Sequence, residues 1–166
     1  MMVPYFSIII PLYNKAPYIR KALESVLAQT YTDYECIIMD DGSTDGSRAT
    51  VEGWLAENNP RCGGRFRLLG QPNQGVAVAR NNVVRAASGE YICFLDADDW
   101  WEPTFLEEMA HLIQVYPKAG LYATNYIYYK TGKTHVALDM PTGYIDYPKA
   151  YLQSTAMPVW TGTVAM

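Results

Sequence analysis

Three carboxylates lie within four residues of the sequence, directly after a short apolar run at residues 91–95; they are Asp96, Asp98 and Asp99. Such a run is typical of a buried strand in an α/β sheet, and these sheets bind ligands beyond the carboxyl ends of their strands. In an extended chain, the spacing of Asp96 and Asp98 puts both side chains on the same side. Two carboxylates placed in this way would supply half of a Mg²⁺ or Mn²⁺ site, with phosphate oxygens completing the coordination shell.

A plainer interpretation of the same residues is structural. Acidic side chains often end a strand and begin a helix, and Asp99 is placed to cap a helix that starts near Pro103. The density of the Asp-Ala-Asp-Asp cluster at residues 96–99 favours the metal site over this alternative.

Strand and helix patterns alternate four times over the first part of the chain. The predicted strands cover residues 5–12, 35–40, 65–69 and 91–95, and the predicted helices cover residues 17–29, 46–57, 76–87 and 104–116. This alternation predicts an α/β fold with a parallel sheet and right-handed crossovers. The loops at the strand ends then converge, namely residues 13–14, 40–43, 71–75 and 96–99. Farther on, we predict two strands at 121–129 and 134–138 around a turn, and the beginning of another at 159–166.

Composition limits what the chain can be. It has 166 residues, of which 49% are hydrophobic and 18% charged, which suits one globular domain. The net charge of −4 argues against a nucleic-acid surface. The apolar runs are too short to span a membrane, and no signal peptide is recognised. The odd set of three cysteines, Cys36, Cys62 and Cys93, lacks zinc-ligand spacing and favours a reduced, cytoplasmic setting.

The familiar nucleotide-binding motifs are missing from the positions where they would be needed. A dinucleotide fold requires G-x-G-x-x-G after the first strand, where this chain reads PLYNKAPY. The Gly-Lys-Thr at residues 132–134 lacks the earlier glycine of a P-loop, because Ile127 stands there. A site built from carboxylates and a metal therefore remains.

Four sequence blocks carry a resemblance. They are SIIIPLYN at 7–14, SVLAQTYTDYECIIMDDGSTDGS at 25–47, NQGVAVARN at 73–81 and GEYICFLDADD at 89–99. In order and spacing, over about residues 5–101, they resemble the inverting glycosyltransferases of family 2, which have the GT-A fold. The resemblance implies a Rossmann-like, mainly parallel sheet flanked by helices, in a single domain over residues 1–166 whose donor-binding half is about 5–101. It also implies a nucleotide-sugar donor, most often a UDP-sugar, and a divalent metal, Mn²⁺ or Mg²⁺.

Carried over by position, the resemblance assigns four residues to the nucleotide's base end. Pro11 and Tyr13 would line the base pocket, with Tyr13 stacking on uracil. Asp41 would accept a hydrogen bond from uracil N3–H, and Gly75 would let the backbone approach the nucleotide. The alternatives are that Tyr13 is a packed loop aromatic and that Asp41 is a turn residue before glycine. We expect the neighbouring Asp40 to be structural.

The resemblance assigns three more residues to the diphosphate end. Arg80 would lie beside the nucleotide, Asp96 would face the ribose and diphosphate, and Asp98 would bind the metal. Carboxylate ligands suit this chemistry, because a divalent cation stabilises the negative charge that grows on a leaving diphosphate. The alternative for Arg80 is a solvated helix residue or a partner of a carboxylate.

Inversion also needs a general base, and no residue stands out for that role. The acidic residues after Trp101 are Glu102, Glu107, Glu108, Asp139 and Asp146, and none has the setting that family members use. Because the chain also ends inside a predicted strand, we expect it to be the N-terminal part of a longer enzyme whose base lies beyond Met166. The acceptor would be a glycan or a lipid-linked sugar. Two further possibilities stay open, namely peripheral association with the inner face of a membrane and a homodimer through the edge of the strand in which the chain ends. The alternative function is a nucleotide- or glycan-binding module without turnover.

Overall fold

The computed structural model describes residues 3–124, 126–128, 133–135 and 164–165. Its main sheet has six strands in the order β3-β2-β1-β4-β8-β5. Four adjacent strands of this sheet are parallel, namely β1 (Phe6–Leu12), β2 (Tyr34–Asp40), β3 (Phe66–Gly70) and β4 (Tyr91–Phe94). At the edge, β8 (Val164–Ala165) runs antiparallel to β4 and to β5 (Tyr122–Ala123). The predicted α/β fold with a mainly parallel sheet is confirmed.

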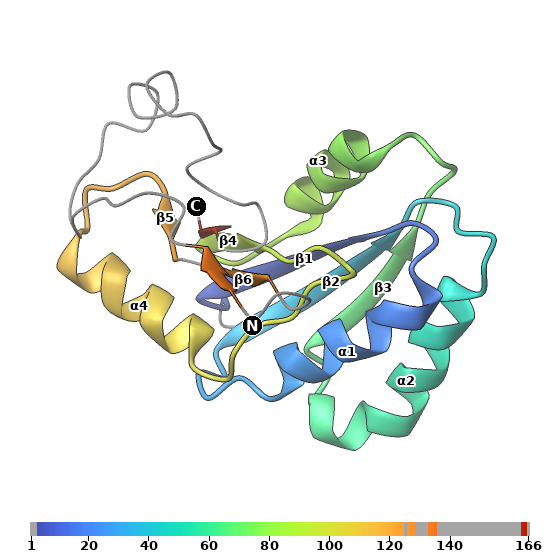
Figure 1. Ribbon diagram of the computed structural model, residues 1–166, viewed down its shortest axis with the longest axis horizontal. Helices are drawn as coiled ribbons and strands as arrows, with labels where there is room; N and C mark the ends of the chain where they lie inside the picture. The colour runs from blue at the N-terminus through green and yellow to red at the C-terminus, as the bar shows by residue number, and fades with distance from the viewer. Residues whose placement is uncertain (1–2, 125, 129–132, 136–163, 166) are drawn as a thin grey trace.

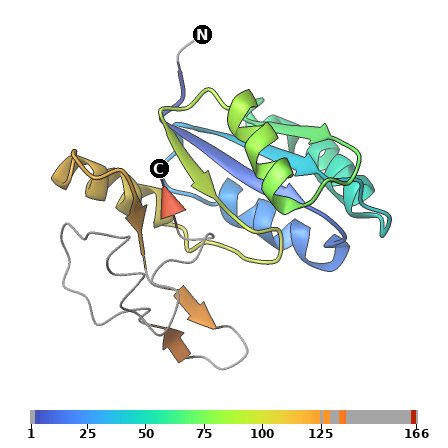
Figure 2. The same cartoon turned by 90° about the horizontal axis from the view of Figure 1, so that it is seen from above.

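Helices cover both faces of this sheet (Figures 1 and 2). They are α1 (Ala16–Leu27), α2 (Ser47–Cys62), α3 (Val76–Ala86) and α4 (Phe105–Val115). α1, α2 and α4 lie on one face, and α3 lies on the other. The chain therefore builds β1, β2 and β3 in one direction, then crosses the opposite face to reach β4 on the far side of β1. The strand order reverses between β1 and β4, and open α/β sheets bind ligands at such a reversal.

The strand β1 contributes to two cores because its side chains alternate between the faces. Phe6, Ile8 and Ile10 pack into the larger cluster with α1, α2 and α4, whereas Ile9 packs into the smaller cluster under α3. All four side chains are fully buried. A central parallel strand covered on both faces needs this continuous apolar sequence, which is why the run at residues 5–12 was recognisable as a strand.

One predicted boundary is wrong. The helix predicted over residues 46–57 continues in the structure to Cys62 and includes Pro60. Side chains support this last turn, since Asn58 Nδ2 donates to the carbonyl of Trp54 at 3.0 Å and Arg61 Nη1 donates to Asn58 Oδ1 at 2.9 Å. The fully buried Trp54 also anchors the helix to the core. The helix ends at Gly63, whose φ of 57° is left-handed.

The later strand predictions are confirmed in part. β6 (Tyr126–Tyr128) pairs with β7 (Lys133–His135) in an antiparallel hairpin, and β8 falls within the strand predicted at 159–166. The strand predicted at 121–129 is divided between β5 and β6, which belong to different sheets. Residues 125, 129, 136–138, 159–163 and 166 of the predicted strands lie outside the described residues. In the described part of the chain, no helix is long and apolar enough to cross a membrane. Cys36, Cys62 and Cys93 are buried, free thiols.

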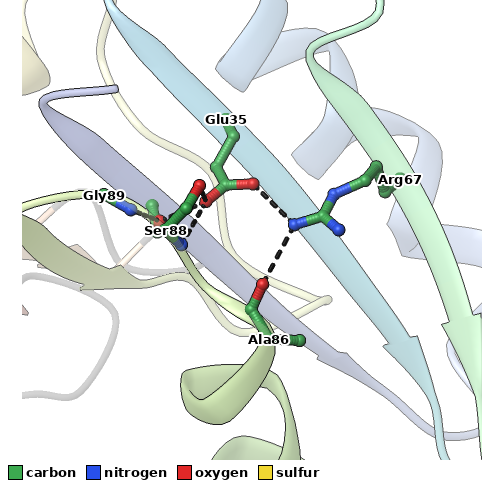
Figure 3. A network of polar contacts seen from close by, with 6 residues as sticks. Glu35, Arg67, Ala86, Ser88 and Gly89 are labelled. Atoms are coloured by element: carbon green, nitrogen blue, oxygen red, sulfur yellow. Dashed lines mark hydrogen bonds and ion pairs between the residues drawn. The ribbon is translucent and has the colours of Figure 1, made fainter. Parts of the chain in front are cut away.

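A polar network at the amino end of the sheet fixes the connection between α3 and β4 (Figure 3). The Glu35 carboxylate accepts hydrogen bonds from Ser7 Oγ at 2.7 Å, from both N and Oγ of Ser88 at 2.7 Å, and from Arg67 Nη2 at 2.6 Å. Arg67 Nη2 also donates to the carbonyl of Ala86, in the last turn of α3, at 3.1 Å. Burial alone would raise the pKa of Glu35, but these hydrogen bonds outweigh it and lower the pKa from 4.5 to about 2.

Candidate functional site

The loops that follow β1 and β2 are locked together by side chain to backbone hydrogen bonds. Asn14, at a left-handed φ of 51°, donates from its backbone N to Ser43 Oγ at 3.1 Å. Its side-chain oxygen accepts from the backbone N of Thr44 at 2.8 Å. The backbone N of Lys15 donates to Ser47 Oγ at 2.8 Å. These bonds set the position of Lys15 relative to the second loop.

Asp45 joins the beginnings of α1 and α2. Its carboxylate accepts from the backbone N of Ser47 at 2.9 Å and from the backbone N of Ala16 at 3.0 Å. The hydrogen bond from the Ser47 hydroxyl is the main cause of the lowered pKa of Asp45, with the Ala16 amide next. The N-cap position of α2 is Gly46, in a left-handed conformation, and Asp45 lies one residue before it. The carboxylate still binds a free amide of the first turn, which is the physical role of a cap.

A cavity of about 610 Å³ opens at the carboxyl edge of the sheet, where the strand order reverses. Its volume falls within the usual range for small-molecule sites. All seven residues singled out from the sequence line it: Pro11, Tyr13, Asp41, Gly75, Arg80, Asp96 and Asp98. Six residues that the sequence analysis did not single out line it as well: Leu12, Lys15, Asn73, Val76, Ala79 and Ala97.

Asp41 organises the loop between β3 and α3. Its residue is 3% exposed, and its Oδ1 accepts from Gln71 Nε2 at 2.7 Å and from the backbone N of Gln74 at 2.9 Å. Its Oδ2 accepts from the backbone N of Gly75 at 2.8 Å. An oxygen of a carboxylate has more than one lone pair, so Oδ2 retains capacity for a ligand N–H. Asp41 is thus more than a turn residue, since it holds residues of another loop at the cavity wall.

Tyr13 and Gly75 leave room on their cavity sides. Tyr13 is 47% exposed, which contradicts the alternative of a packed loop aromatic and leaves the ring accessible. Gly75 has a φ of 87°, and a Cβ built there would meet no atom within 4 Å. A side chain at this position would be strained and would project into open space, so glycine keeps the backbone both accessible and able to adopt this conformation.

Two carboxylates of the acidic cluster at residues 96–99, Asp96 and Asp98, are paired with basic side chains. Arg80, on α3, donates from Nη2 to Asp96 Oδ1. The alternative that Arg80 pairs with a carboxylate is therefore what the structure shows. Lys15 Nζ lies 2.6 Å from Asp98 Oδ2, and both side chains remain accessible, with exposures of 38% and 41%. This hydrogen bond is the main reason that the pKa of Lys15 is raised.

The geometry expected for the acidic cluster is wrong in one respect. β4 ends at Phe94, and the backbone N of Asp99 donates to the carbonyl of Asp96 at 2.9 Å, so residues 96–99 form a turn. Asp96 and Asp98 reach the cavity from this turn, not from one side of an extended strand. The structural alternative also fails, because α4 begins at Phe105 after Thr104 and Asp99 does not cap it.

Two tryptophans, which the sequence analysis did not use, secure the turn. Lys21 Nζ of α1 lies 3.0 Å from the ring centroid of Trp100. The ring of Trp101 stacks on that of Phe105 of α4 with centroids 4.2 Å apart, and its backbone N donates to Ser25 Oγ at 3.2 Å. The acidic turn is therefore tied to two helices through residues directly after it.

The carboxylates present suit a hard divalent cation that shares its shell with a ligand. Among the described residues, no group of three or more His, Cys, Asp and Glu could hold a metal ion. The cavity instead offers Asp96 and Asp98, which are oxygen donors of the kind that Mg²⁺ and Mn²⁺ prefer. Mg²⁺ commonly binds through one or two carboxylates, with water and substrate phosphates as the other ligands.

No general base is identified in the described part of the chain. Among its acidic side chains, those lining the cavity are Asp41, Asp96 and Asp98, and each is engaged as described above. Of the later candidates, Glu107 accepts from Thr30 Oγ1 at 2.9 Å, and neither it nor Glu102 nor Glu108 lines the cavity. Asp139 and Asp146 lie outside the described residues.

Comparison with known proteins agrees with this architecture. Residues 7–163 match the family model described as glycosyl transferase family 2. EpsH of Bacillus subtilis, which carries a glycosyltransferase name, is 38% identical over 153 residues, or 91% of this chain and 42% of EpsH. The chain thus spans about two fifths of the length of that relative.

Two solved structures share the fold. One is Staphylococcus aureus TarS, residues 1–349, in complex with UDP-GlcNAc, with a TM-score of 0.60 and 29% identity over 68% of this chain and 32% of that one. The other is the mannosyltransferase PcManGT from Pyrobaculum calidifontis in complex with GDP-Man and Mn²⁺. It has a TM-score of 0.62 and 30% identity over 73% of this chain and 35% of that one.

Proposed function

The chain belongs to glycosyl transferase family 2 and has the GT-A fold, and from this premise we propose that its cavity binds a nucleoside-diphosphate sugar, a UDP-sugar. The whole enzyme would transfer the sugar to a glycan or lipid-linked acceptor with inversion at the anomeric carbon. One observation carries the proposal, which is that the carboxyl ends of four strands and the segments that follow them bring seven predicted donor-site residues into one cavity of about 610 Å³. The TarS complex with UDP-GlcNAc and the PcManGT complex with GDP-Man support this class of donor.

At the base end, Tyr13 would stack on the uracil and Asp41 would accept its N3–H. An aromatic ring with one accessible face suits a flat base. The Asp41 carboxylate is buried and already fixed by three hydrogen bonds from Gln71, Gln74 and Gly75, so it does not need to reorganise when the base arrives. Pro11 would form the floor of this pocket, and Gly75 would let the backbone approach the nucleotide.

At the diphosphate end, Asp98 would hold Mn²⁺ or Mg²⁺, while Asp96 would face the ribose and diphosphate beside Arg80. When bound, a divalent cation acts as a Lewis acid that stabilises the charge developing on the departing diphosphate. Arg80 is held by Asp96 on the cavity wall and would add a fixed positive charge there. The turn anchored by Trp100 and Trp101 would keep both carboxylates in place as charge builds up.

The acceptor site and the general base belong to other parts of the enzyme in this proposal. The three cavity carboxylates are engaged by amides or by basic side chains, so none is suited to take a proton from an acceptor hydroxyl. We place residues 1–166 in a single domain whose donor half is about 5–101, acting at the cytoplasmic side, with the base beyond the residues described.

The proposal is tested by the effect of nucleotide on the melting temperature. UDP should raise the melting temperature, Mn²⁺ should increase that rise, and Asp98→Asn should remove the part that depends on Mn²⁺, because a neutral amide is a poorer ligand for a hard cation. Asp33→Asn, an exposed change just before β2 at the opposite edge of the sheet, is the matched control and should behave as the wild type. A UDP effect that is identical in excess chelator and in Mn²⁺ would refute the metal assignment, and the absence of any UDP effect would refute the donor assignment.

A further inference from the structure

The ion pair between Lys15 and Asp98 occupies the side chain that the proposed function gives to the metal. Lys15 Nζ lies 2.6 Å from Asp98 Oδ2, so the ammonium group fills one of the lone-pair positions from which that oxygen would bind a cation. The two residues are separated by 83 positions in the sequence and meet only because β1 and β4 are neighbours in the sheet. The pair therefore results from the fold and not from local sequence.

The backbone of Lys15 is fixed by hydrogen bonds, whereas its side chain is held by the accessible ion pair with Asp98. Its N–H donates to Ser47 Oγ at 2.8 Å, and Ser47 is fully buried. Its carbonyl accepts from the backbone N of Tyr18 at 2.9 Å and of Ile19 at 3.0 Å, at the start of α1. The ammonium group is thus tethered at one point of the cavity wall, but the side chain is 38% exposed and can swing.

Stability of the fold does not account for this pair. Ion pairs between side chains as accessible as these typically contribute little to folding. The position of Lys15 and Asp98, in contrast, affects the charge of the cavity. The charged residues lining the cavity are two basic ones, Lys15 and Arg80, and three acidic ones, Asp41, Asp96 and Asp98. With Lys15 in place Asp96 and Asp98 each have a basic partner, and a divalent cation arriving alone would have to compete with the Lys15 ammonium group for Asp98.

We infer that Lys15 keeps Asp98 closed to a divalent cation until a nucleoside diphosphate draws its ammonium group away. The inference rests on the proposed function, because it takes Asp98 as a metal ligand. The diphosphate gives Lys15 a second anionic partner and gives the cation additional oxygen ligands. Metal and nucleotide then bind with positive cooperativity, and Lys15 is a positioning residue that makes each depend on the other. A free metal ion does not fill the site in advance.

The test measures the affinity of Mn²⁺, by electron paramagnetic resonance of the free ion, with and without saturating UDP. Lys15→Met should tighten Mn²⁺ binding without UDP by about 3- to 10-fold, since both a competing ion pair and a repulsive charge are removed. The coupling factor between Mn²⁺ and UDP should fall by a similar ratio. Lys15→Arg keeps the charge and should retain the wild-type coupling.

The matched control is Arg20→Gln in α1, the helix that begins directly after Lys15. This change removes a positive charge whose partner is Glu57, and neither residue lines the cavity. It should leave Mn²⁺ affinity and coupling unchanged. The double change Lys15→Met with Asp98→Asn should abolish the gain. Unchanged Mn²⁺ affinity in Lys15→Met, or a gain that survives loss of Asp98, overturns the inference. Failure of the proposed function has another signature, namely that UDP does not bind the wild type or that Asp98→Asn leaves the UDP and Mn²⁺ response intact.

Discussion

Replacing Glu35 by glutamine should destabilise the protein although Glu35 lies far from the candidate site. The carboxylate accepts from Ser7, from Ser88 through two groups, and from Arg67, and all of these donors point at it from different elements. Glutamine keeps one acceptor oxygen but presents an NH₂ group in place of the other. Donors would then face a donor, and the link between the sheet and the residues after α3 would be weakened (Figure 3).

The size of the effect follows from the ionisation of the carboxyl group. A pKa lowered from 4.5 to about 2 corresponds to roughly 3 kcal/mol of preference for the charged form in the folded state. Arg67 is 45% exposed and Glu35 is 13% exposed, so solvent screens part of this. We expect Glu35→Gln to lower the free energy of unfolding by about 2 kcal/mol at neutral pH.

The pH dependence gives the sharper test. Because the folded pKa lies below the unfolded one, the contribution of Glu35 is fully present above pH 4.5 and is lost as pH falls toward about 2. In urea denaturation, the difference between wild type and Glu35→Gln should be constant from about pH 7 to pH 5 and should shrink below pH 4.5. Glu57→Gln is the control, because Glu57 pairs with the exposed Arg20 and is itself 57% exposed, and it should cost less than about 0.5 kcal/mol. A Glu35→Gln difference that small, or one that is equal at pH 7 and pH 3, would refute the reasoning.

Two further predictions concern the cavity loops. In urea denaturation, Gly42→Ala should lower the free energy of unfolding by about 1–3 kcal/mol, because φ is 74° and a Cβ would lie 2.9 Å from the backbone N of Asn73. The control is Gly53→Ala on α2, where a Cβ meets open space and should stabilise the protein slightly. In calorimetry, UDP should bind more tightly than ADP by about 1–3 kcal/mol. The reason is that uracil N3–H can donate a hydrogen bond to Asp41, whereas the corresponding N1 of adenine carries no hydrogen. Asp41→Asn should reduce the preference for UDP and also lower the melting temperature, since three hydrogen bonds to the carboxylate are disturbed. Equal affinities of the wild type for UDP and ADP would argue against the role of Asp41.

Local patterns were enough to predict the central fold. The apolar runs of β1 and β2 are buried on both faces, so each appears in the sequence as an uninterrupted strand signal. The end of α2 was missed because Pro60 normally argues against a helix. What overrides it is tertiary, namely the buried Trp54 and the side-chain bonds of Asn58 and Arg61, and none of these is visible in a window of residues.

The sequence predicted which residues line the cavity better than it predicted how they are arranged there. Loops at the carboxyl ends of parallel strands must meet at one edge, so a motif in each loop leads to one cavity. The turn at Asp96 could not be foreseen, because whether a strand continues past Phe94 depends on its neighbours in the sheet. Lys15 was overlooked although it directly follows the motif at residues 7–14, since a lysine in a loop has no partner that the sequence reveals.

The sequence did not reveal which groups bind the carboxylates of this site. The bonds that engage its carboxylates run from Gly75 to Asp41, from Arg80 to Asp96 and from Lys15 to Asp98, across separations of 34, 16 and 83 residues. Motifs identify which carboxylates converge, but charge balance depends on which basic groups converge with them. A cavity of bare carboxylates would attract cations indiscriminately, whereas one in which Asp96 and Asp98 already have basic partners favours a cation that brings its own anion. If the proposed function holds, these ion pairs would make the acidic cluster a site for a metal together with a diphosphate.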